Sequence, residues 1–165
     1  MPDTSSKRLL DVLLDSWDRN NRILVNLLSA LPEGGLEARA MDSSPSVAQM
    51  FSHIHYVRLV LVHEDAPELA RPLPDEEWGC ERDRRHMEQV LNDSARAVRE
   101  AVQGRVEAGQ DMDVHYDHPI HLLQHLLWHE GYHHGQIKLA LKVAGLPMAD
   151  DVAGPITWGV WMRRK

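Results

Sequence analysis

The chain has 165 residues, of which 43% are hydrophobic and 26% are charged, the size and composition of a single globular domain. Its 18 Lys and Arg residues against 25 Asp and Glu residues give a formal charge of -7, and an acidic chain of this kind is a poor partner for nucleic acid. One cysteine, Cys80, excludes an internal disulfide framework and is typical of a reducing compartment.

The sequence shows no sign of a membrane span or a secretory leader. No stretch reaches the roughly 18 consecutive apolar residues that a membrane helix needs, and Asp11 and Asp15 interrupt the apolar residues near the N-terminus. We therefore expect a cytoplasmic protein without a membrane partner. We also expect one domain over residues 1–165, because no repeat or low-complexity linker divides the chain.

Apolar residues recur at helical spacing in four stretches, about residues 5–31, 45–63, 81–106 and 119–144. Pro and Gly cluster at the joints between them, and strand patterns are almost absent. This favours an all-α protein, an antiparallel four-helix bundle. The second joint is long enough for a crossover connection. From residue 148 onward we expect a short tail that is extended or irregular and packs back on the bundle.

Histidines follow one another at intervals of four residues at His121, His125, His129 and His133. At about 100° per residue, His133 lies about 40° from His129 and inside the apolar stripe of the last predicted helix. His129 lies at the edge of that stripe, and the earlier two point progressively outward. Two imidazoles one turn apart can converge on an ion about 2 Å from each nitrogen, so this pair predicts a transition-metal site.

Spacing alone does not select a third metal ligand. His53 and His55 flank the apolar stripe of the second predicted helix on opposite sides. His63 lies at the end of that helix, and His86 lies on the third predicted helix. Each of these four histidines is a candidate, because two ligands do not make a tight site.

The string HEGYH at residues 129–133 also matches HExxH, the zincin motif. The downstream residues of the longer motif are missing, since Gly135 comes one residue early and Leu139 stands where a third histidine would be needed. Zincins also bind peptide along a strand edge, whereas this sequence is helical throughout. A zincin-like peptidase is therefore a remote alternative.

Three parts of the chain resemble the DinB/YfiT-like superfamily of metal-binding four-helix bundles. They are His53-Ile54 in the second predicted helix, the HxxYHxGQI run at residues 129–137, and Trp17 with the LLSALP ending of the first predicted helix. The resemblance implies a metal triad of His53, His129 and His133. It also implies one divalent metal ion and a homodimer.

Three imidazoles leave coordination positions open, which is the pattern of a catalytic rather than a structural metal site. The resemblance implies a divalent-metal-dependent enzyme that acts on a small-molecule substrate, either as a thiol S-transferase with a low-molecular-weight thiol cosubstrate or as a metal-assisted hydrolase. Zinc or nickel is expected, and iron, manganese, cobalt or copper also suit such ligands. The alternative is a non-catalytic metal-binding bundle that acts in a stress response or by binding a partner.

Further residues of the last predicted helix are candidates for supporting roles. Gln136 lies next to the histidine stripe and is expected to orient a ligand ring through a hydrogen bond. Glu130 is a candidate general base, although its position about 100° from His129 favours a solvated or interhelical role. Tyr132 is a candidate proton donor.

Overall fold

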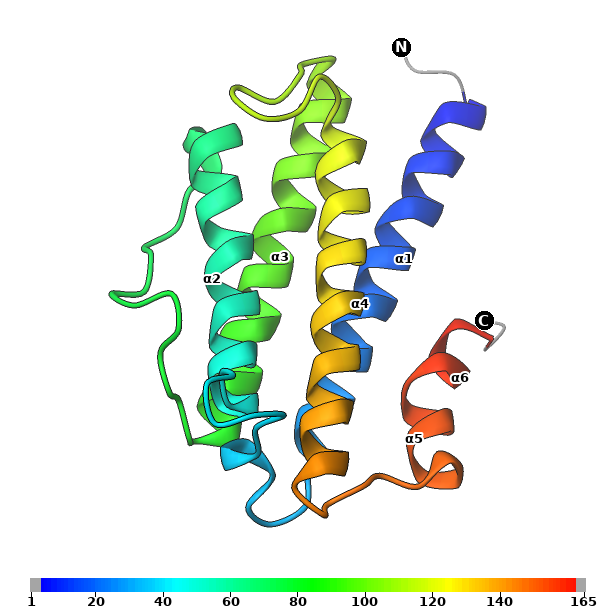
Figure 1. Cartoon of the computed structure of the whole chain (residues 1–165). Helices are drawn as coiled ribbons and strands as arrows, with labels where there is room; N and C mark the ends of the chain where they lie inside the picture. Colours follow the sequence, from blue (N-terminus) through cyan, green and yellow to red (C-terminus); the bar gives the residue numbers. More distant parts are fainter. Residues whose placement is uncertain (1–3, 163–165) are drawn as a thin grey trace.

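A computed structural model describes residues 4–162, which are mostly helical (Figure 1). The structure contains four long helices, α1 (Thr4–Ser29), α2 (Val47–Asp65), α3 (Arg84–Ala108) and α4 (Pro119–Val143), with 3-10 turns η1 (Gly35–Glu37) and η2 (Pro67–Leu69) in the connections and two short helices, α5 (Asp150–Ile156) and α6 (Trp158–Trp161), after α4. No strand is present among residues 4–162. The prediction of an all-α helical bundle is confirmed.

Capping side chains set the starts of the middle helices. The Ser46 hydroxyl accepts a hydrogen bond from the Gln49 amide at 3.2 Å, and the Gln49 side chain accepts one from the Ser46 amide at 2.9 Å. This capping box starts α2 at Val47, so Pro45 precedes the helix instead of opening it. Asp83 caps α3 by accepting hydrogen bonds from amides of the first turn.

The segment between α2 and α3 returns along the bundle, so that α3 begins at the same end as α2 (Figure 1). Arg84, at the start of α3, donates a hydrogen bond to the carbonyl of Leu31, just beyond the end of α1. Arg105, in the last turn of α3, pairs with Glu68, just beyond the end of α2. Consequently α3 runs antiparallel to α1 and parallel to α2.

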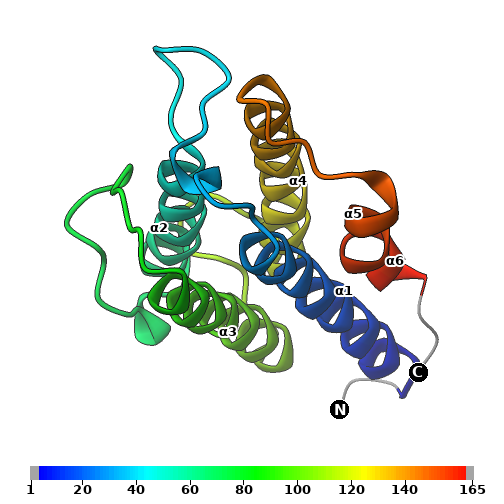
Figure 2. The same ribbon diagram turned by 90° about the horizontal axis from the view of Figure 1, so that it is seen from below.

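The four long helices surround one core, with α1 and α2 at opposite corners and α3 and α4 between them (Figure 2). Because α4 runs antiparallel to α2, the first half of α2 faces the second half of α4, and these halves carry His53 and His133. Within the part of the chain that the structure describes, no helix is both long and apolar enough to cross a membrane.

The core consists of two apolar clusters with a polar layer between them. One cluster surrounds Phe51 and joins the end of α1, the starts of α2 and α3 and the end of α4. The other surrounds Trp17 and joins the opposite ends of the same helices. Arg58 and Glu130, both fully buried, lie at the level between the clusters.

The C-terminal tail is more regular than the sequence predicts. Instead of an extended or irregular segment, the chain forms α5 and α6, and Val160 is buried against the bundle. Arg19 of α1 donates a hydrogen bond to the Val160 carbonyl at 2.7 Å. Gly154 and Pro155 lie inside α5, although both residues disfavour a helix by propensity. Packing of α5 against α1 outweighs this propensity.

Candidate metal centre

Three histidine side chains converge between α2 and α4. His53 comes from α2, and His129 and His133 come from α4, one turn apart. The Nε2 atom of His129 lies 3.1 Å from Nε2 of His53 and 3.1 Å from Nε2 of His133. Nitrogens bound at about 2.0–2.1 Å to one tetrahedral ion are about 3.3 Å apart. The three rings therefore stand at nearly the separation that one ion requires.

The remaining nitrogens of two of these rings lie close to oxygen atoms, in a hydrogen bond at His133 and at ion-pair distance at His53. His133 Nδ1 donates to Gln136 Oε1 at 2.8 Å, and His53 Nδ1 lies 2.9 Å from Glu77 Oε1. With the proton of each neutral ring on Nδ1, its Nε2 atom presents a lone pair toward the centre. His129 Nε2 lies between the lone pairs of His53 Nε2 and His133 Nε2, and it carries at most one proton. Without a metal ion it can donate a hydrogen bond to only one of them. One cation at the centre would satisfy all three nitrogens, so the residues fit a metal ion.

Burial keeps the three imidazoles in the neutral form that binds metal. His53 and His133 are 8% and 6% exposed. Burial lowers the pKa of His129 to about 3, with smaller contributions from the neighbouring His133 and His53. Burial also lowers the pKa of His133 and of His53, and at His53 the Glu77 carboxylate opposes this shift. A metal ion would therefore displace few protons from this site at neutral pH.

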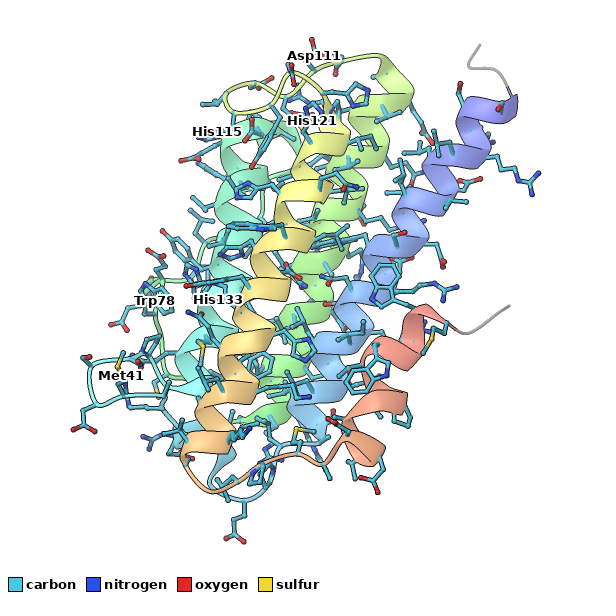
Figure 3. The ribbon with its side chains drawn as sticks, turned by 45° about the vertical axis from the view of Figure 1, so that its right-hand side comes forward. Met41, Trp78, Asp111, His115, His121 and His133 are labelled. Carbon is cyan, nitrogen blue, oxygen red and sulfur yellow. The ribbon has the colours of Figure 1, made fainter. Side chains whose placement is uncertain are left out.

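The crossover, residues 66–83 between α2 and α3, contributes two residues to the centre that sequence patterns did not reveal, Glu77 and Trp78. The Trp78 ring stacks on His53 with ring centroids 3.9 Å apart and planes inclined by 3°. It also meets His133 edge-on at 6.3 Å between centroids, and Figure 3 shows the two side chains next to each other. These contacts depend on the path of the crossover, which neither periodicity nor motif spacing specifies.

Glu130 points into the polar layer of the core and is 1% exposed. The Arg58 guanidinium binds its two oxygens, with Nε 2.6 Å from Oε1 and Nη2 2.7 Å from Oε2. Asn20 donates a further hydrogen bond to Oε2 at 2.5 Å. These are the contacts of an interhelical ion pair, and burial keeps the carboxylate away from a substrate that approaches from solvent.

Tyr132 lies at the outer rim of the histidine cluster. It is 56% exposed, and its ring meets the His133 ring edge-on with centroids 5.3 Å apart. On the other side it stacks on the exposed Trp128. This position allows contact with a molecule that approaches the centre from solvent.

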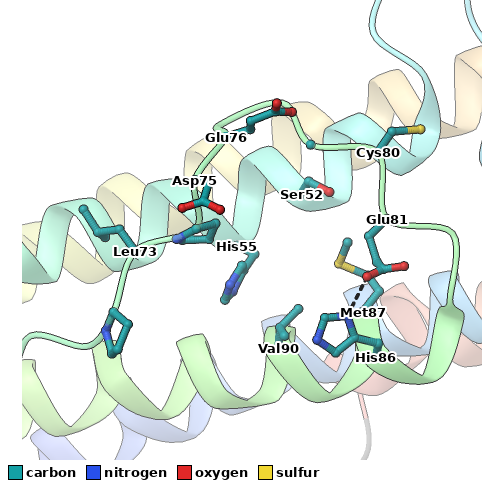
Figure 4. Close-up of a pocket in the computed structure, with 13 residues that line it drawn as sticks. Ser52, His55, Leu73, Asp75, Glu76, Cys80, Glu81, His86, Met87 and Val90 are labelled. Carbon is teal, nitrogen blue, oxygen red and sulfur yellow. Dashed lines mark hydrogen bonds and ion pairs between the residues drawn. The ribbon is translucent and has the colours of Figure 1, made fainter.

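The other candidate third ligands lie elsewhere. His55 lies on the far side of α2 and lines a cavity of about 600 Å³ between α2, α3 and the crossover (Figure 4). His86 lines the same cavity and pairs with Glu81 at 2.5 Å, while His63 is exposed at the end of α2. Of the histidines flanking the α2 stripe, only His53 lies with the pair on α4.

The first histidines of the four-residue series make separate contacts toward the other end of the bundle, where His121 lies (Figure 3). His121 pairs with Asp117 at 2.8 Å, and the His125 ring makes a hydrogen bond of 2.7 Å with the Tyr116 hydroxyl. Among the residues that the structure describes, His53, His129 and His133 are the one group of three potential ligands brought together.

Comparison with known proteins agrees with this architecture. A family model described as the DinB family matches residues 1–154, which include all four long helices and the three converging histidines. No curated protein and no solved structure shows a significant match to the chain. The family model covers most of the chain, and the chain therefore belongs to the DinB family.

Proposed function

We propose that this protein is a divalent-metal-dependent enzyme that transfers a low-molecular-weight thiol to a small electrophilic molecule. The observation that supports this most is the convergence of three Nε2 atoms from His53, His129 and His133. A site built from three neutral imidazoles leaves ligand positions open, as catalytic metal sites do. Zinc or nickel is the expected ion, because imidazole suits both.

A bound divalent ion would acidify a thiol or a water molecule that reaches the centre. The surrounding residues favour the thiol. Both oxygens of Glu130 are held by Arg58 and Asn20, so this carboxylate does not serve as a base for water. A thiol has a pKa of about 8.5 and needs less help to lose its proton than water does. Metal-assisted hydrolysis is therefore the second choice.

The same contacts argue against a peptidase. In the zincin mechanism the glutamate of HExxH acts as the general base beside the metal. Here Glu130 lies in the core and is bound to Arg58. The described chain also has no strand on which a peptide could align.

A conjugation assay tests this proposal. Protein reconstituted with zinc or nickel is incubated with a chromogenic electrophile and a panel of small thiols, with and without chelator. We expect metal-dependent thioether formation, in which the thiol sulfur replaces the leaving group of the electrophile and the thiol proton and the leaving group are released to solvent. The rate should be lost with His129→Ala and unchanged with His118→Ala, because His118 caps α4 away from the centre. If the protein binds metal but no thiol reacts above background, the transferase proposal fails. Hydrolysis of a small ester or amide would then support the second choice, and no turnover at all would support a non-catalytic metal-binding bundle.

A further inference from the structure

The shortest contacts between the crossover and the metal centre are made with His53. Glu77 Oε1 lies 2.9 Å from His53 Nδ1, and the Trp78 ring covers the face of the imidazole at 3.9 Å between centroids. The Gln49 side chain donates a hydrogen bond to the Trp78 carbonyl at 3.3 Å. Gln49 is also the capping-box residue of α2, so the crossover is attached to the start of the helix that carries His53.

From these contacts we propose that Glu77 and Trp78 are positioning residues of the metal centre. Glu77 holds the proton of His53 on Nδ1, and Trp78 fixes the plane of the ring. Together they aim Nε2 at the point where His129 and His133 converge. The inference rests on the proposed function, because it assigns these residues to the metal site that the function requires.

His53 needs such support more than the other two ligands do. His129 and His133 are held in register by one helix, and His133 is further oriented by Gln136, three residues away on α4. His53 comes alone from a different helix. The crossover supplies the Glu77 contact to its Nδ1 atom and the Trp78 contact to the face of its ring.

The chemistry of both contacts suits this role. A metal-bound imidazole commonly donates its other N–H to a carboxylate, which fixes the tautomer and makes the ring a better ligand. Loss of such a partner typically weakens metal binding by about 10- to 100-fold. A coplanar indole restricts rotation of the ring about its side-chain torsions without competing for either nitrogen.

Zinc affinity of the full chain, measured by competition with a chromogenic chelator, tests the inference. We expect Glu77→Ala and Trp78→Leu each to weaken binding by about 10-fold. Glu77→Gln should retain most of the affinity, because its amide oxygen still accepts a hydrogen bond. Matched controls are Glu76→Ala, the neighbouring carboxylate on the same segment, and Trp161→Leu, a partly exposed tryptophan on α6.

A spectroscopic readout separates positioning from general destabilisation. Long-range proton–nitrogen spectra of the zinc form should show His53 as the Nδ1–H tautomer, and the Nδ1 signal should shift in Glu77→Ala but not in Glu76→Ala. Glu77 is 46% exposed at its side chain, so its substitution leaves the core intact. Helicity by circular dichroism checks each variant.

The outcomes separate the inference from the proposed function. Wild-type protein that binds zinc, together with Glu77 and Trp78 variants that bind equally well, overturns the inference and leaves the metal centre standing. Wild-type protein that does not bind zinc, nickel or another divalent ion overturns both.

Discussion

Arg58 and Glu130 form a bidentate ion pair inside the bundle, with N–O distances of 2.6 and 2.7 Å. Neither side chain is exposed. Arg58 also donates hydrogen bonds to Asn21 and to the Leu91 carbonyl, so the pair links α1, α2, α3 and α4. Glu130, which the HExxH motif marks as a general base, thus holds the four helices together next to the metal ligands.

This ion pair predicts that the effects of substituting its two partners do not add. Glu130→Leu leaves the Arg58 charge buried without its carboxylate and should lower the free energy of unfolding by about 3–5 kcal/mol. Arg58→Met should cost a similar amount. The double variant should be more stable than either single variant, because it leaves no unpaired charge in the core.

Urea unfolding of the wild type, the two single variants and the double variant measures the coupling energy between Arg58 and Glu130. Losses that simply add in the double variant would show that Arg58 and Glu130 do not stabilise the fold as a pair.

Most of the fold could be predicted because long amphipathic helices leave a clear periodic pattern. The ends of α4 lie close to the predicted ones, since Pro119 opens the helix and Gly145 ends it with a φ of 76°. The start of α2 was predicted less well, because Ser44 and Ser46 flank Pro45 and either could cap a helix. The reciprocal hydrogen bonds of Ser46 and Gln49 make Ser46 the cap. The prediction of an extended or irregular tail was wrong, because the helices of the tail are short and depend on packing.

The candidate site was predictable where its residues share one helix. The interval of four residues identified His129 and His133, and the angular count favoured a solvated or interhelical role for Glu130, of which the structure shows the interhelical one. His53 could not be separated from His55 by spacing, because both flank the same stripe. Glu77 and Trp78 reach the centre only through the path of the crossover, which leaves no local pattern.

The tail offers a test of its packing. A Cβ atom on Gly159 would lie 2.9 Å from the Gly154 carbonyl oxygen, closer than real Cβ contacts allow. Gly159→Ala should therefore push α5 and α6 apart and lower the free energy of unfolding by about 1–3 kcal/mol.

Gly131→Ala is the matched control, because Gly131 is helical and has open space around its Cβ position. It should stabilise the protein slightly. Thermal unfolding compares the two variants, and equal melting temperatures would contradict the observed packing of the tail.

Metal-free protein should lose stability as the pH falls from neutral. Burial lowers the pKa of His55 to about 4 and that of His129 to about 3, from an ordinary value of 6.5. Below pH 6.5 the histidines of the unfolded chain bind protons, whereas His55 of the folded chain stays neutral down to about pH 4. The free energy of unfolding therefore decreases progressively between pH 7.5 and about pH 4.

Urea midpoints measured in chelator at pH 7.5, 6.5 and 5.5 test this dependence. His55→Gln should show a shallower loss, because one of the buried imidazoles is gone. A midpoint that stays constant or rises toward pH 5.5 would contradict the neutral state of these histidines.

We propose that the outer face of α4 forms the interface of the homodimer that the resemblance implies. Trp128 is 71% exposed, and Tyr132, Leu139 and Val143 are exposed along the same side of the helix. We expect light scattering to give the mass of a dimer for wild-type protein and that of a monomer for Trp128→Glu. Leu9→Glu, at an exposed position on α1, should remain dimeric. A monomeric wild type would refute this assembly.

The metal content of purified protein tests the central claim most directly. Elemental analysis of wild-type protein, reconstituted with zinc and passed through a desalting column, should give one ion per chain. His129→Ala, which removes the nitrogen that lies 3.1 Å from both other ligands, should give close to none while remaining helical. An equal metal content in the two proteins would contradict a site formed by His53, His129 and His133.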